Sequence, residues 1–238
     1  IDKVIVDGAT AIGHRAFMDC TDLVEVSLPN VTKIGVEAFY NCRKLQDISF
    51  NSKASLISQG AFAECLTLNN VDLSTIGTEC SIGDGAFFNC PLSTLTFGST
   101  GVNVLGEGAF ATNSPGDDRL TEVNMESSRI STYGDRLFSG RTKLTDVVMS
   151  GKFGDNGNIA EEDRTLPETM FIGCFNLGRV KFPEHCGYVL YGKDEVGDTI
   201  NGVTGSAIFT DVKNRQFYVE GPALNANSDR ASQREELQ

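Results

Sequence analysis

One pattern of apolar and polar positions recurs along the chain. Its first copy runs from Ile12 to Leu28 and reads Ile-Gly-x-x-Ala-Phe-x-x-Cys-x-x-Leu-x-x-Val-x-Leu. At its end, the apolar residues Val26 and Leu28 alternate with the polar residues Glu25 and Ser27. Such alternation is typical of a strand with one buried face. The pattern therefore predicts a short strand whose apolar side chains point inward.

The middle of the pattern predicts a second wall. Its apolar residues are Ala16, Phe17, Cys20 and Leu23. They follow one another at offsets of one, four and seven residues, which fit a turn or two of helix with an apolar face. A glycine precedes this segment in most copies, as Gly13 does in the first. We expect it to permit a backbone conformation or a close approach that larger residues would block.

The phenylalanine of the pattern marks each copy. It occurs at Phe17, Phe39, Phe62, Phe87, Phe110, Phe138 and Phe171, and a degenerate eighth copy contains Phe209. The first four separations are 22 to 25 residues, and the later ones are 28, 33 and 38. The shorter separations fall within the roughly 20–29 residues of leucine-rich repeats. Because such units bury their apolar faces only by stacking, we predict an elongated solenoid with a ladder of stacked phenylalanine rings.

The repeated unit resembles the BspA-like, or Treponema pallidum-type, leucine-rich repeat of bacterial surface proteins. The resemblance covers roughly residues 4 to 219. It implies a leucine-rich repeat solenoid, a right-handed α/β-type superhelix of about seven to eight repeats, each with one short strand in a curved parallel sheet. We expect a repeat domain at 1–219, insertions at 112–119, 151–166 and 192–205, and a C-terminal cap or frayed tail at 220–238.

Charge and composition exclude some classes of protein. The chain has 20 basic and 32 acidic residues and a net charge of −12, whereas nucleic-acid binding requires a basic face. No run of 18 apolar residues occurs, so we expect no membrane span. The chain begins at Ile1 without a Met or an apolar leader, and we expect that any export signal has been removed from it.

The seven cysteines favour packing over chemistry. Cys20, Cys42, Cys65, Cys90 and Cys174 each follow the repeat phenylalanine by three residues. Free cysteine behaves as a small buried hydrophobe, and zinc ligands are usually paired two to four residues apart. We therefore expect a column of inert thiols and no metal or cofactor. Cys80 and Cys186 lie off this register, and a bridge between Cys174 and Cys186 remains open in an exported protein.

Catalytic groups are scarce. The two histidines, His14 and His185, lack the nucleophile and orienting group that a catalytic base requires. We therefore expect no enzymatic activity. The insertions at 151–166 and 192–205 are rich in acidic and amide side chains. Their order does not match the regular ligand series of an EF-hand, and calcium binding there stays open.

The strand neighbours of the inward residues should form outward columns, because stacking aligns equivalent positions. The candidate protein-binding face consists of Glu25, Asp47, Asp72, Glu122, Asp146, Arg179, Lys181 and Tyr218. It is largely acidic and becomes basic near the C-terminus.

The resemblance implies a non-enzymatic adhesion module, at the cell surface or secreted, with an extracellular host or bacterial protein as its partner. Two alternatives stay open. A glycan-binding module would usually offer exposed aromatic side chains, and Tyr218 is the clear outward candidate. A structural spacer would display another domain away from the cell.

Overall fold

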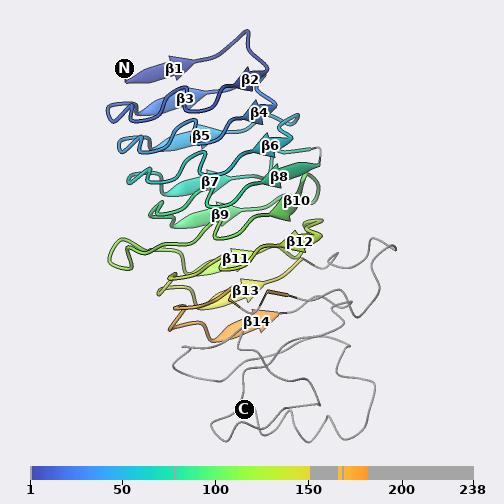
Figure 1. The fold of residues 1–238 in the computed structure, drawn as a ribbon. Coiled ribbons are helices and arrows are strands. Elements are labelled where there is room, and N and C mark those ends of the chain that lie inside the picture. Colours follow the sequence, from blue (N-terminus) through green and yellow to red (C-terminus); the bar gives the residue numbers. More distant parts are fainter. Residues whose placement is uncertain (1, 78, 151–165, 168, 182–238) are drawn as a thin grey trace, which may run out of the picture.

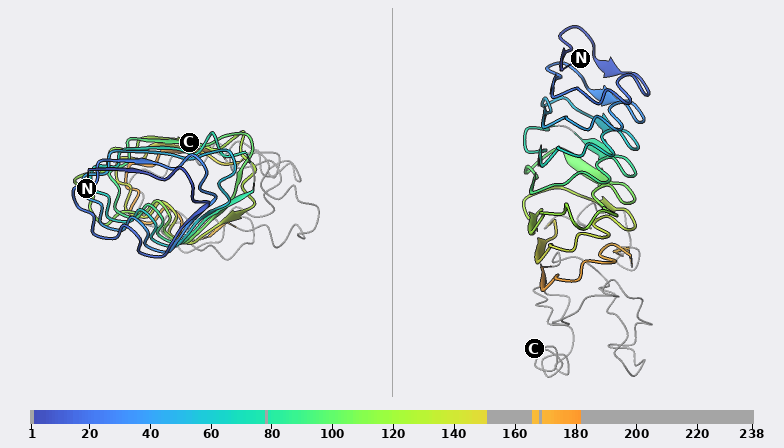
Figure 2. Two further views of the ribbon diagram at one scale, coloured as in Figure 1. Left: turned by 90° about the horizontal axis from the view of Figure 1, so that it is seen from above. Right: turned by 90° about the vertical axis from the view of Figure 1, so that its left-hand side faces the viewer.

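The computed structural model describes residues 2–77, 79–150, 166–167 and 169–181, and these form a solenoid of stacked turns (Figure 1). The N-terminal strand lies at one end of the stack and the last described strand at the other. Viewed along the stack, successive turns superimpose around a common interior (Figure 2). The predicted solenoid is confirmed.

Each of the first six turns contributes two strands, one to each of two parallel sheets. One strand per repeat was predicted. Sheet A has eight strands in the order β1 (Lys3–Ile5), β3 (Glu25–Ser27), β5 (Asp47–Ser49), β7 (Asn70–Asp72), β9 (Thr94–Thr96), β11 (Glu122–Asn124), β13 (Asp146–Val148) and β14 (Arg179–Lys181). Sheet B has six strands in the order β2 (Ala11–Ile12), β4 (Lys33–Ile34), β6 (Leu56–Ile57), β8 (Cys80–Ile82), β10 (Val102–Leu105) and β12 (Thr132–Tyr133). The single predicted strand corresponds to sheet A.

The third wall consists of turns, and the predicted helical segment is wrong. No helix occurs among the described residues. Arg15 and Asp19 have φ values of 56° and 60°, in the left-handed region that a right-handed helix excludes. The N–H of Phe17 donates across the stack to Ala38 O at 2.8 Å, whereas that of Ala16 donates to Gly13 O within its own turn. The segment therefore adds a hydrogen-bonded ladder between repeats in place of helical bonds.

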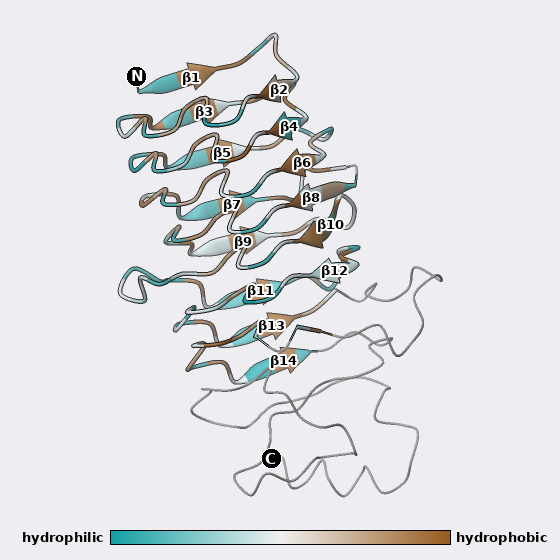
Figure 3. Ribbon diagram, in the orientation of Figure 1, coloured by the Kyte–Doolittle hydropathy of each residue, from teal (hydrophilic) through white to brown (hydrophobic). Residues whose placement is uncertain are grey.

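The interior is filled by the predicted apolar positions. In sheet A, Val26 and its counterparts on the later strands are buried and Val4 of β1 is partly buried, while the residues on either side of them face outward. This alternation is visible in the strands of Figure 3. The phenylalanine rings form one column. Adjacent centroids from Phe17 to Phe171 lie 5.1 to 5.9 Å apart, and every pair is stacked. The predicted ring ladder is confirmed over seven copies.

The repeat glycines permit close approach between turns. A Cβ atom on Gly134 would lie 2.3 Å from the carbonyl carbon of Gly106, and one on Gly106 would lie 2.6 Å from the backbone nitrogen of Asp84. Neither glycine has a positive φ. Of the two roles considered for these glycines, the structure supports close approach.

The cysteine column lies beside the phenylalanine column. The thiols of Cys42, Cys65, Cys90 and Cys174 each donate to the carbonyl oxygen of the phenylalanine one repeat earlier, at 3.1 to 3.2 Å. Burial disfavours the thiolate and raises the pKa of Cys42 and Cys174 to about 12. The sixth described cysteine, Cys80, is buried in sheet B, and burial raises its pKa to about 12 as well.

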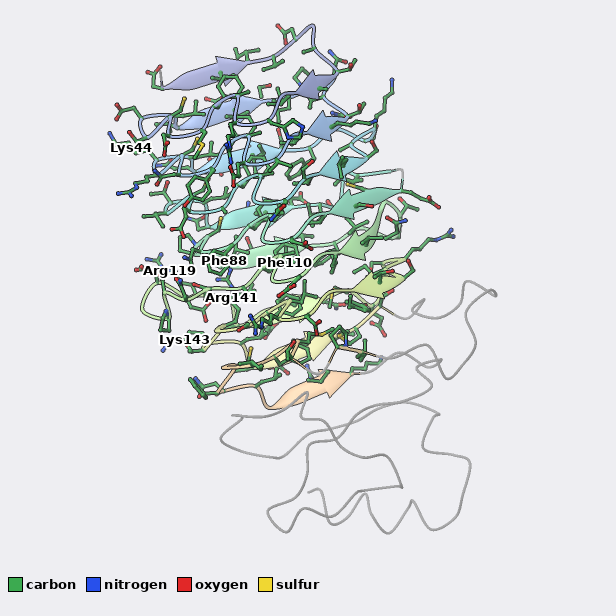
Figure 4. The ribbon with its side chains drawn as sticks, viewed as in Figure 1. Lys44, Phe88, Phe110, Arg119, Arg141 and Lys143 are labelled. Atoms are coloured by element: carbon green, nitrogen blue, oxygen red, sulfur yellow. The ribbon has the colours of Figure 1, made fainter. Side chains whose placement is uncertain are left out.

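Two charged residues interrupt the cysteine column. Arg141 follows Phe138 by three residues and takes the cysteine position of its repeat. Its Nε donates to Phe110 O at 2.6 Å, the bond that a thiol makes elsewhere (Figure 4). The preceding repeat has no cysteine, and Asp118 from the 112–119 insertion pairs with Arg141 Nη1 at 3.2 Å. Burial lowers the pKa of the Arg141 guanidinium, and the Asp118 carboxylate opposes that shift.

Several predictions fall outside the described residues. These are the eighth copy, Cys186, the 192–205 insertion, the tail at 220–238 and, except for Leu166, the 151–166 insertion. Cys174, the other half of the bridge considered above, carries a thiol that donates to Phe138 O.

Candidate functional site

The outward face of sheet A contains two columns of side chains. Strand pairing places Lys3, Glu25 and Asp47 side by side, and likewise Glu122, Asp146 and Arg179. Between these groups Asn70 pairs with Thr94. The second column consists of Ile5, Ser27, Ser49, Asp72, Thr96, Asn124, Val148 and Lys181. The sequence-predicted residues from Glu25 to Lys181 thus lie on one face, whereas Tyr218 lies outside the described residues.

Basic residues neutralise both ends of the first column. Lys3 Nζ lies 2.7 Å from Glu25 Oε1, and Arg179 Nε lies 2.6 Å from Asp146 Oδ1. Two of the five predicted acidic residues are therefore ion-paired. Sequence reasoning did not include Lys3 in the face. The signal was present, because Lys3 and Val4 repeat the polar and apolar order of Glu25 and Val26 in β3.

Three acidic residues of the face form no ion pair with any described residue. They are Asp47, Asp72 and Glu122, and they lie on β5, β7 and β11. The Oδ1 atom of Asp72 accepts a hydrogen bond from the Ser74 backbone N–H at 2.9 Å, which fixes its side chain. The negative charge of the face is therefore concentrated between its two neutralised ends.

Lys181 also has a partner that the sequence did not reveal. Its Nζ lies 2.7 Å from Oε1 of Glu126, which follows β11, although 55 positions separate the two residues. This pair joins the last described turn to the turn two repeats earlier. Lys181 is consequently less available as a free cation than its place in the sequence indicates.

The rim beside sheet A carries several basic side chains. Lys44, Arg119 and Lys143 lie along the same edge of the stack (Figure 4). Lys44 Nζ lies 2.6 Å from Asp22 Oδ1, and this contact lowers the pKa of that exposed carboxyl. A groove of about 350 Å³ extends from Asp47 to Arg119, so the acidic face and the rim meet at a hollow of mixed charge.

A larger groove, of about 540 Å³, lies between β9 and β11. These strands share one registered pair, Thr96 with Asn124, whereas β11 and β13 share three. The groove is lined by Ser93, Thr94, Leu95, Thr96, Phe97, Thr121, Glu122, Asn124, Met125, Ser127 and Ser128. Its lining is thus rich in hydroxyl groups and contains one charged group, the Glu122 carboxylate.

Phe97 is unusual among the residues at its repeat position. Its counterparts Leu28, Phe50, Leu73 and Met125 are buried, whereas Phe97 is half-buried. The ring packs edge-on against Phe110 at 6.1 Å between centroids. Phe97 therefore keeps some accessible surface beside the groove, in the middle of the stack.

Other chemistry is limited in the described part of the chain. No group of three or more His, Cys, Asp and Glu side chains there could hold a metal ion. His14, one of the two candidate bases, accepts a hydrogen bond at Nδ1 from the Val36 backbone N–H at 3.0 Å. Among the described residues, no helix has the length and apolar character needed to cross a membrane.

The chain matches one protein-family model. The model of the BspA type Leucine rich repeat region matches in six copies, over residues 2–115, 57–160 and 80–190. No curated protein matches the chain.

Similar solved structures include a leucine-rich repeat protein from Bacteroides ovatus, with 20% identity and a TM-score of 0.43, and the T. pallidum Leucine Rich Repeat protein, with 22% and 0.46. A leucine rich cell surface protein from Faecalibacterium prausnitzii has 21% identity and a TM-score of 0.45. The matches cover 75% to 76% of this chain, which spans 40%, 68% and 59% of those chains respectively. The repeat pattern, the stacked parallel strands and the match of the family model together place this chain in the BspA-type leucine-rich repeat family.

Proposed function

We propose that the chain is a non-enzymatic protein-binding module, at the cell surface or secreted, that adheres to an extracellular protein through the outward face of sheet A. Membership of the BspA-type repeat family supports an interaction role. The observation that carries the proposal is the alignment of Asp47, Asp72 and Glu122 on one sheet face without ion pairs to described residues.

This arrangement suits a partner with a basic surface. The carboxylates project from paired strands, so their backbone positions are fixed before binding. Little conformational entropy is therefore lost when the partner binds. Complementary charge increases the rate of encounter and disfavours acidic competitors. The ion pairs at Glu25 and Asp146 restrict the free negative charge to the centre of the face.

An array of extracellular proteins and glycans, probed with the purified chain at low and physiological salt, tests the proposal. The test variant carries Asp47→Asn, Asp72→Asn and Glu122→Gln. The control carries Asp7→Asn, Glu107→Gln and Asp117→Asn, which remove the same charge from exposed positions outside sheet A.

A protein partner should bind more weakly at higher salt, and the test variant should lose about tenfold or more in affinity while the control changes by less than about twofold. Equal losses in both variants would contradict the assignment to sheet A. If no protein binds, the spacer alternative gains support.

A further inference from the structure

The groove between β9 and β11 carries an inference beyond protein adhesion. We propose that it binds an uncharged sugar residue of a glycan, with hydrogen bonds from the strand side chains and an apolar sugar face against Phe97. The volume of about 540 Å³ lies within the range of about 300–1,000 Å³ typical of small-molecule sites.

The polar groups of the groove match a polyol. Thr94, Thr96, Glu122 and Asn124 face outward from two adjacent strands, two on each side. Sugar hydroxyls both donate and accept, and this set offers a carboxylate acceptor, an amide and two hydroxyls. Hydrogen-bonding groups are thus available on both sides of a sugar ring that lies along the groove.

Two of these side chains are already oriented. Asn124 Oδ1 accepts from the Glu126 backbone N–H at 2.9 Å, which directs the remaining amide donors of Asn124 away from that turn. Thr94 Oγ1 donates to the side-chain oxygen of Asn70, which leaves its lone pairs as acceptors. A site whose polar groups are held before binding loses less conformational freedom when the ligand arrives.

The partial exposure of Phe97 supplies the second, independent observation. Phe97 lies in the groove lining, and the equivalent residues of the neighbouring repeats, Leu73 and Met125, are fully buried. An aromatic face attracts the C–H groups of a sugar through weak hydrogen bonds and buried apolar area. The sequence indicated an exposed aromatic at Tyr218 alone, because the alternation of β9 predicts that Phe97 faces the core.

Charge decides which glycan fits. No lysine or arginine lines the groove, and Glu122 adds a negative charge. Sialylated and sulfated sugars would therefore be repelled, and the occupant is a neutral glycan. A basic side chain of a protein would satisfy Glu122 but would leave the surrounding hydroxyls and Phe97 without a matching group.

The experiment uses the full chain on an array of neutral oligosaccharides built from glucose, galactose, mannose and N-acetylglucosamine. Sialylated and sulfated oligosaccharides and a lysine-rich peptide are arrayed beside them. Calorimetry then measures the affinity for the best neutral ligand. The two test variants are Asn124→Ala and Phe97→Leu, the second of which installs the residue found at Leu28 and Leu73. The control variant carries Asp47→Asn and Asp72→Asn, which lie on sheet A outside the groove.

Binding of a neutral oligosaccharide is expected, with little dependence on salt. Each test variant should weaken it by about tenfold, the upper range for one lost hydrogen bond or aromatic contact, and the control should leave it unchanged. Three results would overturn the proposal: no neutral ligand bound, a neutral ligand bound equally by the test variants, or salt-sensitive binding of the lysine-rich peptide alone. Because the control removes part of the proposed adhesive face, loss of protein adhesion and loss of glycan binding are distinguished.

Discussion

Arg141 and Asp118 form a buried ion pair at the place where the other repeats stack cysteines. Arg141 Nη1 lies 3.2 Å from Asp118 Oδ1, and both side chains are fully buried. The pair also fixes the backbone, because Arg141 Nε donates to Phe110 O and Asp118 Oδ2 accepts from the Lys143 N–H. An aspartate from an insertion and an arginine from the next repeat thus replace two thiols.

Breaking this pair should destabilise the chain strongly. Asp118→Ala leaves the Arg141 guanidinium charged and buried, and we expect a loss of about 3–5 kcal/mol in the free energy of unfolding. The double variant Asp118→Leu/Arg141→Cys restores the repeat thiol and removes both charges. It should lie within about 1.5 kcal/mol of the parent, because apolar replacement of a buried pair is often neutral. Urea denaturation of Asp118→Leu, Arg141→Cys and the double variant provides the comparison, and additive losses would contradict the coupling.

The phenylalanine column predicts a large cost for one truncation. Phe62 stacks between Phe39 at 5.1 Å and Phe87 at 5.4 Å and is fully buried. Phe62→Ala should lower the free energy of unfolding by about 3–5 kcal/mol, the usual cost of a large cavity. Phe88→Ala, at a half-buried position, is the control and should cost clearly less. A melting curve of the Phe62 variant that matches the parent would refute the stacking role.

The thiol column predicts slow alkylation in the folded chain. Burial raises the pKa of Cys42 and Cys174 to about 12 and that of Cys65 well above its ordinary value. A higher pKa means less thiolate at a given pH, and the thiolate is the reactive form. At pH 8 these cysteines should react with iodoacetamide only on unfolding, whereas the half-buried Cys20 should react first. Peptide mass spectrometry over time, with and without urea, measures the order, and early labelling of Cys65 would contradict it.

The repeat glycines offer a matched pair of substitutions. A Cβ on Gly134 would lie 2.3 Å from the carbonyl carbon of Gly106, whereas one on Gly13, at the same repeat position in the first copy, would meet nothing within 4 Å. Gly134→Ala should therefore cost about 1–3 kcal/mol or more through forced backbone shifts. Gly13→Ala should change the free energy of unfolding by less than about 0.5 kcal/mol. Thermal melts of both variants measure the two losses of stability. Equal losses would show that the close approach between turns does not cause the cost of Gly134→Ala.

The sequence contained enough information for the stack, the outward columns and the ring ladder, because those features depend on repeat spacing and two-residue alternation. The helix prediction failed for a physical reason: apolar offsets of one, four and seven do not distinguish a helix from successive tight turns. A further signal was present. Residues that tolerate positive φ recur two positions after the phenylalanine, as at Asn41, Asn89 and Gly140.

The structural features that could not be predicted from the sequence arise where the repeats are irregular or their strands are very short. Nothing in the spacing reveals that Asp118 turns inward to meet Arg141, because the 112–119 insertion has no counterpart in other copies. The strands of sheet B are two to four residues long, which is too short to show a period. Phe97 is half-buried beside the groove between β9 and β11, and alternation along one strand does not report such a groove.

The phenylalanine column has a consequence for how such surfaces diversify. Neighbouring rings are separated along the chain by as few as 22 residues, from Phe17 to Phe39, and as many as 33, from Phe138 to Phe171. The distance between adjacent ring centroids nevertheless stays between 5.1 and 5.9 Å. The axial pitch of the ring column therefore hardly changes with the length of chain between its rings. Loops can therefore lengthen or shorten over evolution while the spacing of the outward columns of sheet A stays the same. The loops and the outward side chains can be selected independently.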